Sequence, residues 1–338
     1  MKKQTSDHTK SDIEISSLYA DYIPEFIVQG LIKRFGINIL AAERGAGKTR
    51  FMLWYAYSII YGCADTLGYP IKIFGDVLFV NLELAEKELK SFFEPIKNYF
   101  EKELRLKPKH NLNIMTFKGK NVEICDILKS VAEYHPLLTI IDNYKLFQYS
   151  ILQSQPGTRD ITNSNFAMVL KPLNEIIDLY GTTVLLINHT NKGTRYSPSS
   201  ADLMFGPGAL PDLVDQVSLL RKTSQPNQRI IVPDKSRYSA EGLITTNLVS
   251  LESSDDASPI PEWLKFELIE SNVDEFDHLP SLTESNRISK KQKTEVIQFM
   301  KQKLGTMEEC AEKILGDGKK KGTVSKIIKK YTESLLNP

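Results

Sequence analysis

The sequence predicts an α/β protein, with a mainly parallel sheet covered by helices on both faces, an antiparallel extension of that sheet, and a small all-α C-terminal module. Continuous apolar strands alternate with helical segments between residues 37 and 187, which is typical of parallel strands buried on both faces. Between residues 208 and 270, strand-like segments follow one another without helices. After Arg287 lysine predominates over acidic residues, and three short helices fit the sequence.

Apolar runs predict the strands of the first part, and length with composition predicts its helices. Pro95 is expected to kink or divide the second helix, because proline lacks the N–H that the helix needs. The predicted strands are Ile37–Ala41, Asp76–Leu82, Leu112–Phe117, Leu137–Ile141 and Thr183–Ile187, and the predicted helices are Lys48–Tyr61, Leu84–Glu103, Val122–Glu133 and Ser164–Leu179.

The later part of the chain is expected to add antiparallel strands and then to change character. Residues 1–17 are polar and predicted to be disordered. Residues 18–275 form the predicted core, 276–289 a linker and 290–338 the helical module. The expected strands are Gln216–Leu220, Gln228–Val232, Leu243–Ser250 and Leu264–Glu270, and the expected helices are about Gln292–Leu304, Met307–Leu315 and Thr323–Leu335.

Composition excludes several classes of protein. The net charge of +1 gives the whole chain no polyelectrolyte character. Cys63, Cys125 and Cys310 are far apart, which argues against a zinc site or a disulfide framework and favours a reducing compartment. No apolar run reaches the roughly 18 residues of a membrane span, and no apolar segment follows the two N-terminal lysines. We therefore expect a cytoplasmic protein without a membrane partner.

The stretch NILAAERGAGKT, Asn38–Thr49, is close to the phosphate-binding pattern G-x-x-x-x-G-K-[ST]. Alanine occupies the place of the first glycine, which is acceptable if that residue keeps a negative φ. The loop lies between a predicted strand and a predicted helix, so its N–H groups would face phosphate oxygens. Lys48 would reach the β- and γ-phosphates of ATP, and Thr49 would ligate Mg²⁺. A chance turn remains the alternative. The predicted nucleotide-binding residues are Ala42, Glu43, Arg44, Gly45, Ala46, Gly47, Lys48, Thr49 and Arg50.

Three polar residues lie at the ends of other predicted strands. Asp142 closes LLTIID and could hold Mg²⁺ through water, although many buried strands end in aspartate. Glu83 ends VLFVNLE, and it is either a general base for the water that attacks the γ-phosphate or a helix-capping carboxylate. His189 follows TVLLIN, and it either senses the γ-phosphate or is a hydrogen-bonded structural residue.

Two pairs of cations lie further along the chain. Lys235 and Arg237 follow the strand RIIV and could reach a neighbouring subunit's phosphate as an arginine finger does, but exposed pairs of this kind are common. Lys192 and Arg195 lie among small and polar residues, where they contact DNA or belong to a solvated surface.

In their order these motifs resemble the RecA-like P-loop ATPases, and among them the branch of plasmid RepA-type hexameric replicative helicases. The similarity runs from about Pro24 to Glu270 and includes GCADTLGYPIKIFGDVLFVNLE and TTVLLINHTNKG. The resemblance implies that Lys48 and Thr49 are the P-loop pair, Glu83 the catalytic glutamate, Asp142 the Walker B aspartate, His189 the sensor, and Lys235 and Arg237 cations acting in trans.

The resemblance also implies an assembly and a DNA channel. Subunits of the related helicases form rings, so a homo-oligomer, expected to be a hexamer, is implied here. Phe147–Asn163 and Asn191–Gly208 match the loops that face the channel, where basic residues would track single-stranded DNA without sequence preference. The first of these two segments has few cations.

The C-terminal tail fits a helix-turn-helix or a winged-helix variant. TMEECAEKILG would be the supporting helix and GTVSKIIKKY the recognition helix, which would enter a major groove. A solvated basic tail or a docking arm is the alternative. The residues expected to contact DNA phosphates are Lys319, Lys320, Lys321, Lys326, Lys329 and Lys330.

Together these observations predict an ATP-hydrolysing DNA motor, a helicase or translocase, acting in the replication of a plasmid, phage or mobile element. Two alternatives stay open: a sequence-specific DNA-binding regulator switched by ATP, and a recombinase-type filament protein.

Overall fold

The computed structural model describes residues 25–117, 123–153, 163–191, 199–206, 208–236, 245–255, 258, 260–279, 290–302, 304–315, 324–325 and 328. The chain divides after His278 into two compact units, which are described separately. Several predicted features lie outside the described residues: the N-terminal segment 1–17, most of the predicted linker, Lys192, Arg195, Arg237 and the tail lysines Lys319, Lys320, Lys321, Lys326, Lys329 and Lys330.

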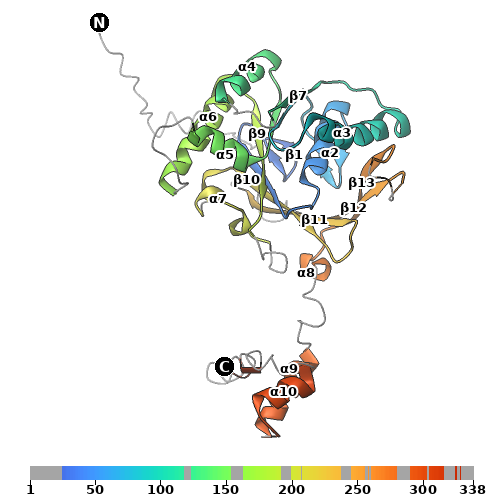
Figure 1. The fold of residues 1–338 in the computed structure, drawn as a ribbon. Coiled ribbons are helices and arrows are strands. Elements are labelled where there is room, and N and C mark those ends of the chain that lie inside the picture. The colour runs from blue at the N-terminus through green and yellow to red at the C-terminus, as the bar shows by residue number, and fades with distance from the viewer. Residues whose placement is uncertain are drawn as a thin grey trace, which may run out of the picture. The chain divides into compact units, whose positions relative to one another are not determined.

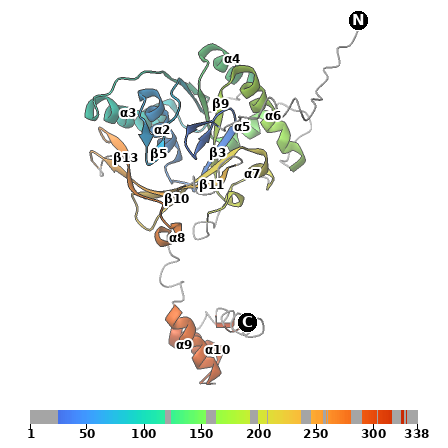
Figure 2. The same cartoon turned by 180° about the vertical axis from the view of Figure 1, so that it is seen from behind.

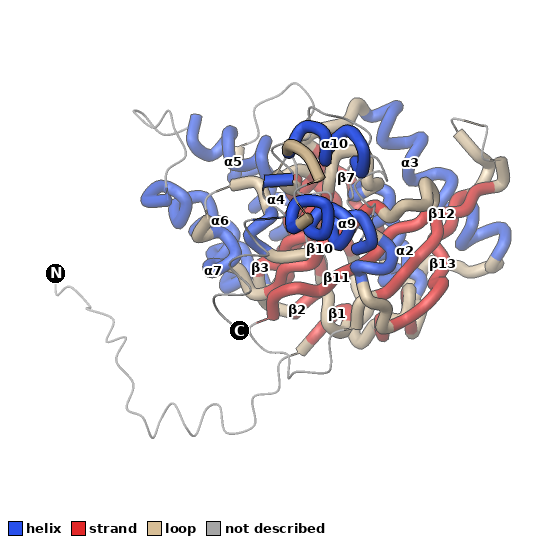
Figure 3. Tube along the Cα trace, turned by 90° about the horizontal axis from the view of Figure 1, so that it is seen from below, coloured by secondary structure: helices blue, strands red, loops and turns tan. Residues whose placement is uncertain are grey.

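A nine-stranded sheet forms the centre of the first unit, in the order β13-β12-β11-β10-β3-β9-β8-β6-β7 (Figure 1). The strands from β10 to β7 in this order run parallel, whereas β11, β12 and β13 are antiparallel to their neighbours. Figure 3 shows β10 to β13 as adjacent strands of the same sheet. The predicted mostly parallel α/β sheet with an antiparallel extension is confirmed. The strands are β3 (Ile37–Ala42), β6 (Val77–Asn81), β7 (Leu112–Thr116), β8 (Leu138–Asp142), β9 (Thr183–His189), β10 (Gln216–Lys222), β11 (Gln228–Ser236), β12 (Asn247–Ser253) and β13 (Leu264–Ser271).

Helices cover both faces of the parallel strands (Figures 1 and 2). α2 (Lys48–Tyr61) and α3 (Glu86–Asn98) lie together on one side, and α4 (Ile124–Tyr134), α5 (Tyr144–Gln153) and α6 (Asn163–Tyr180) lie together on the other. Every residue of β6 and β8 is buried, because alternate side chains point to opposite faces and both faces are covered. None of the described helices is both long and apolar enough to cross a membrane.

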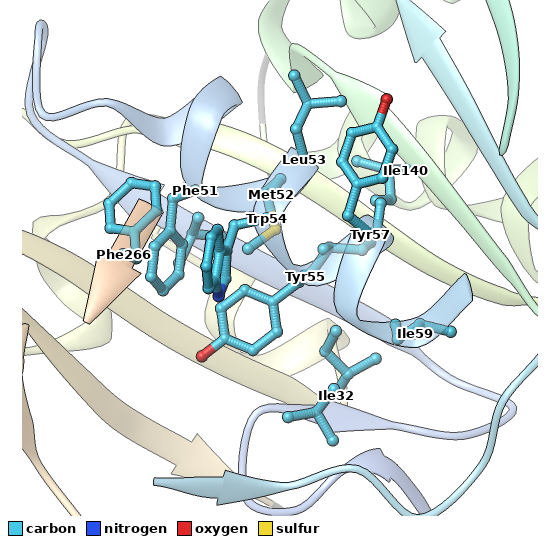
Figure 4. Packing of buried hydrophobic residues seen from close by; sticks show 14 of the residues in the cluster. Ile32, Phe51, Met52, Leu53, Trp54, Tyr55, Tyr57, Ile59, Ile140 and Phe266 are labelled. Atoms are coloured by element: carbon cyan, nitrogen blue, oxygen red, sulfur yellow. The ribbon is translucent and has the colours of Figure 1, made fainter. Parts of the chain in front are cut away.

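The core on the α2 side is rich in aromatic residues (Figure 4). Phe266 of β13 packs edge-on against Phe51 of α2, with ring centroids 5.5 Å apart, and its centroid lies 5.9 Å from that of Trp54. Trp54 also packs on Phe100, and its indole N–H donates to the Thr66 hydroxyl. The first helix after β3 therefore binds the antiparallel edge of the sheet to its parallel half.

The structure departs from the prediction in several local features. α3 continues through Pro95, and its geometry changes only at a π-helical turn, η1 (Tyr99–Glu103). Residues 144–153 form α5, so the first part of the expected channel loop Phe147–Asn163 is helical, and residues 154–162 lie outside the described residues. Several small elements were not predicted from the sequence, namely β1 (Phe26–Val28), β2 (Ile32–Lys33), β4 (Asp65–Thr66), β5 (Tyr69–Pro70), η3 (Ala201–Leu203), α7 (Leu210–Leu213) and α8 (Glu275–His278).

In the second unit, α9 (Lys290–Lys301) and α10 (Met307–Leu315) are well-defined helices. Thr306 and Glu309 form a reciprocal cap at the start of α10: Thr306 N donates to Glu309 Oε2 at 2.7 Å, and Glu309 N donates to Thr306 Oγ1 at 3.2 Å. Of the predicted third helix, only Val324, Ser325 and Ile328 are described. The small apolar core contains Val296, Phe299, Cys310, Ala311, Leu315 and Val324. Two of the three predicted helices are present, whereas the third helix and the helix-turn-helix arrangement stay predictions.

Candidate nucleotide-binding site

Four of the predicted site residues lie at one edge of the sheet. β3, β9, β8 and β6 are adjacent and parallel, so their carboxyl ends meet there. Ala42, the last residue of β3, pairs with His189, the last residue of β9. Asn81 at the end of β6 pairs with Asp142 at the end of β8, and Glu83 follows two residues after Asn81. Ligands of α/β sheets bind at this edge.

The loop between β3 and α2 has the backbone that its glycines predict. Gly45 and Gly47 adopt φ values of 70° and 91°, where any other side chain would be strained. Gly47 is the N-cap of α2, so the free N–H groups of the first helical turn open toward the loop. Ala42 stays in the extended backbone of β3 and is absent from the residues with positive φ. The condition under which alanine can replace the first glycine is therefore met.

Lys48 is buried and its ammonium has two acceptors. Nζ lies 3.1 Å from His189 Nδ1 and 3.4 Å from the Glu43 carbonyl oxygen. Burial lowers the pKa of Lys48, and the carboxylates of Asp142 and Glu83 oppose that shift. Burial and the neighbouring Lys48 charge lower the pKa of His189, which favours a neutral imidazole whose Nδ1 accepts a hydrogen bond from the Lys48 ammonium. The P-loop lysine and the predicted sensor thus form one hydrogen-bonded pair.

Thr49 and Asp142 form the second pair of the site. Thr49 Oγ1 donates to Asp142 Oδ2 at 2.5 Å. Asp142 is fully buried, and burial raises its pKa to about 6 despite the Thr49 hydrogen bond. Its other oxygen, Oδ1, has no hydrogen-bond partner among the described residues. A hydroxyl beside a carboxylate with one unused buried oxygen suits Mg²⁺, which prefers oxygen ligands and retains part of its water shell.

Glu83 contacts Asn143 and does not cap α3. Asn143 Nδ2 donates to Glu83 Oε2 at 2.5 Å, and Asn143 Oδ1 accepts from Leu146 N at 3.1 Å. The peptide bond between Asp142 and Asn143 is cis. The N-cap of α3 is Ala85, and no side chain caps that helix. The helix-capping interpretation of Glu83 is therefore wrong.

Three cations of the β10–β11 hairpin contact the phosphate loop, and none of them was predicted from the sequence. Lys222 Nζ donates to the Arg44 carbonyl at 2.9 Å, and Arg229 Nε donates to the Ala46 carbonyl at 2.8 Å. Arg221 Nε lies 3.9 Å from Glu43 Oε1. The sequence does contain a signal for them, since basic residues flank the short turn that separates two predicted strands, but only the sheet order brings that turn to the loop.

The remaining predicted residues occupy less central positions. Arg50 extends toward α3, where its guanidinium lies 4.5 Å from the Phe92 ring centroid. Lys235 belongs to β11 and pairs with Val217 of β10. Lys192, Arg195 and Arg237 lie outside the described residues.

A basic and aromatic group near the site was also missed. Lys145, in the first turn of α5, lies 4.6 Å from the Phe205 ring centroid and 5.8 Å from that of Tyr149. Phe205 N donates to the His189 carbonyl at 2.7 Å, which attaches this group to the end of β9. Tyr149 is 42 % exposed. An exposed aromatic ring beside a cation is a common feature of protein surfaces that bind single-stranded nucleic acid.

Comparisons with known proteins agree with this fold. The model of a family described as "AAA domain" matches residues 20–195, which is more than half of the chain. No curated protein matches the sequence. One similar solved structure is entitled "The Structure Of A DnaB-Like Replicative Helicase And Its Interactions With Primase", with a TM-score of 0.50 and 15% identity. The match covers 72% of this chain and 65% of that one, and it supports the fold.

The predicted resemblance to RecA-like P-loop ATPases is thus confirmed, while the RepA-type branch stays a prediction. The family match spans the phosphate loop, the strand end at Asp142 and the strand end at His189. The chain belongs to this AAA domain family of P-loop ATPases.

Proposed function

We propose that this protein hydrolyses ATP and uses the energy to move along single-stranded DNA as a ring of identical subunits. The observation that carries the proposal is the meeting of Lys48, Thr49, Asp142, Glu83 and His189 at one sheet edge. These are the groups that phosphoryl transfer to water requires: a phosphate cradle, a metal site and a base.

Each residue has a separate role in the proposed hydrolysis. The amides of the loop and Lys48 bind the phosphates, while Thr49 and Asp142 would hold Mg²⁺, which neutralises charge that develops on the phosphate oxygens when it is bound. Glu83 accepts the proton of the attacking water, and Asn143 orients its carboxylate. His189, through its contact with Lys48, registers whether the γ-phosphate is present.

The motor interpretation rests on the surface near the site and on the similar helicase fold. Lys145 and Tyr149 provide a charge and an exposed ring on α5, where bases could stack. Lys192 and Arg195 would add charge on a second channel loop. Lys235 and Arg237 would act on the ATP of a neighbouring subunit, so the site is completed only in an oligomer. A hexamer and a role in DNA replication are part of this proposal.

The ATPase rate with and without single-stranded DNA tests the motor directly, together with strand separation on a forked substrate. The wild-type protein is expected to hydrolyse ATP faster with DNA and to separate strands, whereas Glu83→Gln should bind ATP and do neither. If DNA does not change the ATPase rate of the wild-type protein and no strands are separated, the proposed motor function is wrong.

A second candidate function is a sequence-specific DNA-binding regulator whose ATP site controls assembly. The second unit favours it, because α9 and α10 have their own apolar core and a capped helix start, as a small DNA-reading module would need. The tail lysines would then bind phosphates of duplex DNA.

Deletion of residues 287–338 separates the two functions. A motor should retain hydrolysis that single-stranded DNA stimulates, since its channel lies in the first unit. A regulator should lose DNA binding altogether. Binding of duplex DNA by the full chain should also weaken steeply with salt, with a slope of log affinity against log salt near −4.5 if about five phosphates are neutralised.

A further inference from the structure

Arg221 stands out among the buried side chains of the first unit. It lies near the carboxyl end of β10, is only 1 % exposed, and is the largest side chain among the fully buried ones. A buried guanidinium is costly unless its charge and its donors are matched. The groups that match it should therefore reveal what it is for.

Two of these groups contact different nitrogens of the guanidinium. Nε lies 3.9 Å from Oε1 of Glu43 in the phosphate loop. Nη1 donates to Ser199 Oγ at 2.9 Å. Ser199 in turn donates its N–H to Glu275 Oε1 at 2.7 Å and its hydroxyl to Glu275 Oε2. Arg221 thus connects the phosphate loop to α8, the last element of the first unit.

Glu43 explains why such a connection is needed. Its carboxylate belongs to a loop that must hold a highly negative triphosphate, and like charges repel over several ångströms in a partly buried site. Glu43 Oε1 is buried and makes no hydrogen bond to the described residues, so its charge is matched by ion pairing with Arg221 and by the nearby charge of Arg229. The Glu43 carbonyl meanwhile accepts from Lys48 Nζ and from Ala46 N.

We propose that Arg221 is a positioning residue for ATP binding: it neutralises the Glu43 carboxylate, turns it away from the phosphates, and anchors that part of the loop through Ser199 to Glu275. The inference rests on the proposed function, because it assumes that the loop binds ATP. In this role Arg221 acts through Glu43 and not by contact with the nucleotide, which makes the role separable from ordinary packing.

The test is a double-mutant cycle with calorimetric titration of ATP and a measurement of the thermal unfolding midpoint. Arg221→Met should weaken ATP binding about tenfold, because the freed Glu43 charge then opposes the phosphates. Glu43→Gln alone should tighten binding about twofold, since it removes a negative charge from the loop. Combining Glu43→Gln with Arg221→Met should restore affinity to within about threefold of wild type.

Lys33→Met provides the matched control. Lys33 is another buried cation, 4 % exposed, and its Nζ lies 3.5 Å from Asp215 Oδ1, away from the loop. It should lower the unfolding midpoint by an amount similar to Arg221→Met and leave ATP affinity within about twofold of wild type. If Arg221→Met does not fold, Arg221→Lys replaces it, with about threefold weaker binding that Glu43→Gln again reverses.

The outcomes distinguish the positioning role of Arg221 from the proposed function of the protein. If the wild-type protein binds ATP but Arg221→Met matches Lys33→Met in affinity, the positioning role is wrong and the proposed function stands. The same holds if Glu43→Gln fails to restore affinity in the double variant. If the wild-type protein binds no ATP, the proposed function and the positioning role fail together.

Discussion

The two halves of the large sheet contribute to the site in different ways. In the parallel half, the chemical groups lie directly at strand ends: Lys48 and Thr49 after β3, Glu83 after β6, Asp142 on β8 and His189 on β9. The other half contains the antiparallel strands β11, β12 and β13 and begins with β10, which is itself parallel to β3. In this antiparallel half, β10 and β11 contribute Arg221, Lys222 and Arg229, which contact backbone or side chains of the phosphate loop.

This difference separates the groups that we propose to take part in the reaction from the groups that support the loop. Parallel strands bring their carboxyl ends to one edge, so short motifs after each strand suffice to assemble the chemistry. The hairpin of β10 and β11 instead lies beside β3 and fixes the shape of the loop. Changes in the parallel half should therefore affect reaction and phosphate binding most, and changes in the antiparallel half should affect stability or lower ATP affinity less than the loss of Lys48 does.

Glu83→Gln should produce the largest change. Removing the proposed base is expected to slow ATP hydrolysis about 10³-fold while ATP still binds, because general bases contribute roughly that much. Single-turnover hydrolysis measures the rate, and calorimetry measures the binding. Glu86→Gln, an exposed glutamate in the first turn of α3, is the control and should hydrolyse ATP normally. If the two variants hydrolyse ATP at equal rates, Glu83 is not the general base.

Among changes in the antiparallel half, Phe266→Ala should have the largest effect. We expect it to lower the stability of the protein. The ring is 3 % exposed and packs on Phe51 and Trp54, so its loss should reduce the free energy of unfolding by about 3 kcal/mol. Urea unfolding measures this. Ile269→Ala, on the same strand but 45 % exposed, should cost far less. If both variants unfold at the same urea concentration, β13 does not contribute to the core as described.

Lys48→Ala should weaken ATP binding about 30-fold, because charge-assisted hydrogen bonds to phosphate are lost. Equilibrium titration measures the affinity. Lys90→Ala removes an exposed lysine that pairs with Glu94 on α3, and ATP should bind that variant as it binds the wild type. An unaltered affinity in Lys48→Ala would mean that the loop does not hold the triphosphate.

Lys222→Met should have the smallest effect, a loss of about threefold in ATP affinity, because one hydrogen bond from its ammonium to the Arg44 carbonyl disappears. Lys265→Met, on β13, is the control, since Lys265 pairs with Glu252 and Glu267 outside the loop. If Lys222→Met weakened ATP binding as much as Lys48→Ala does, Lys222 would contact the phosphates directly. The antiparallel half would then supply a phosphate-binding group and not only support the loop.

Most of the fold could be predicted because the strands of a covered parallel sheet are continuous apolar runs. The predicted bounds of β3, α2, β8 and β9 agree with the structure to within a residue or two. α5 (Tyr144–Gln153) was missed although Asn143 before it is a typical N-cap residue and accepts from Leu146 N, because the resemblance assigned Phe147–Asn163 to a loop. The kink expected at Pro95 was predicted wrongly, because α3 continues through this proline. The helix changes to a π-helical turn only at Tyr99, four residues later.

The sequence by itself determined the central groups of the candidate nucleotide site, because a glycine-rich turn, a lysine, a threonine and strand-ending carboxylates can be recognised by their order and spacing. Only the tertiary structure decided how these groups are held: the pairing of Lys48 with His189, the contact of Asn143 with Glu83, and the matching of Glu43 by Arg221. The physical reason is distance along the chain. Local backbone geometry is encoded by neighbouring residues, whereas the compensation of a buried charge depends on which remote strand the sheet order places beside it.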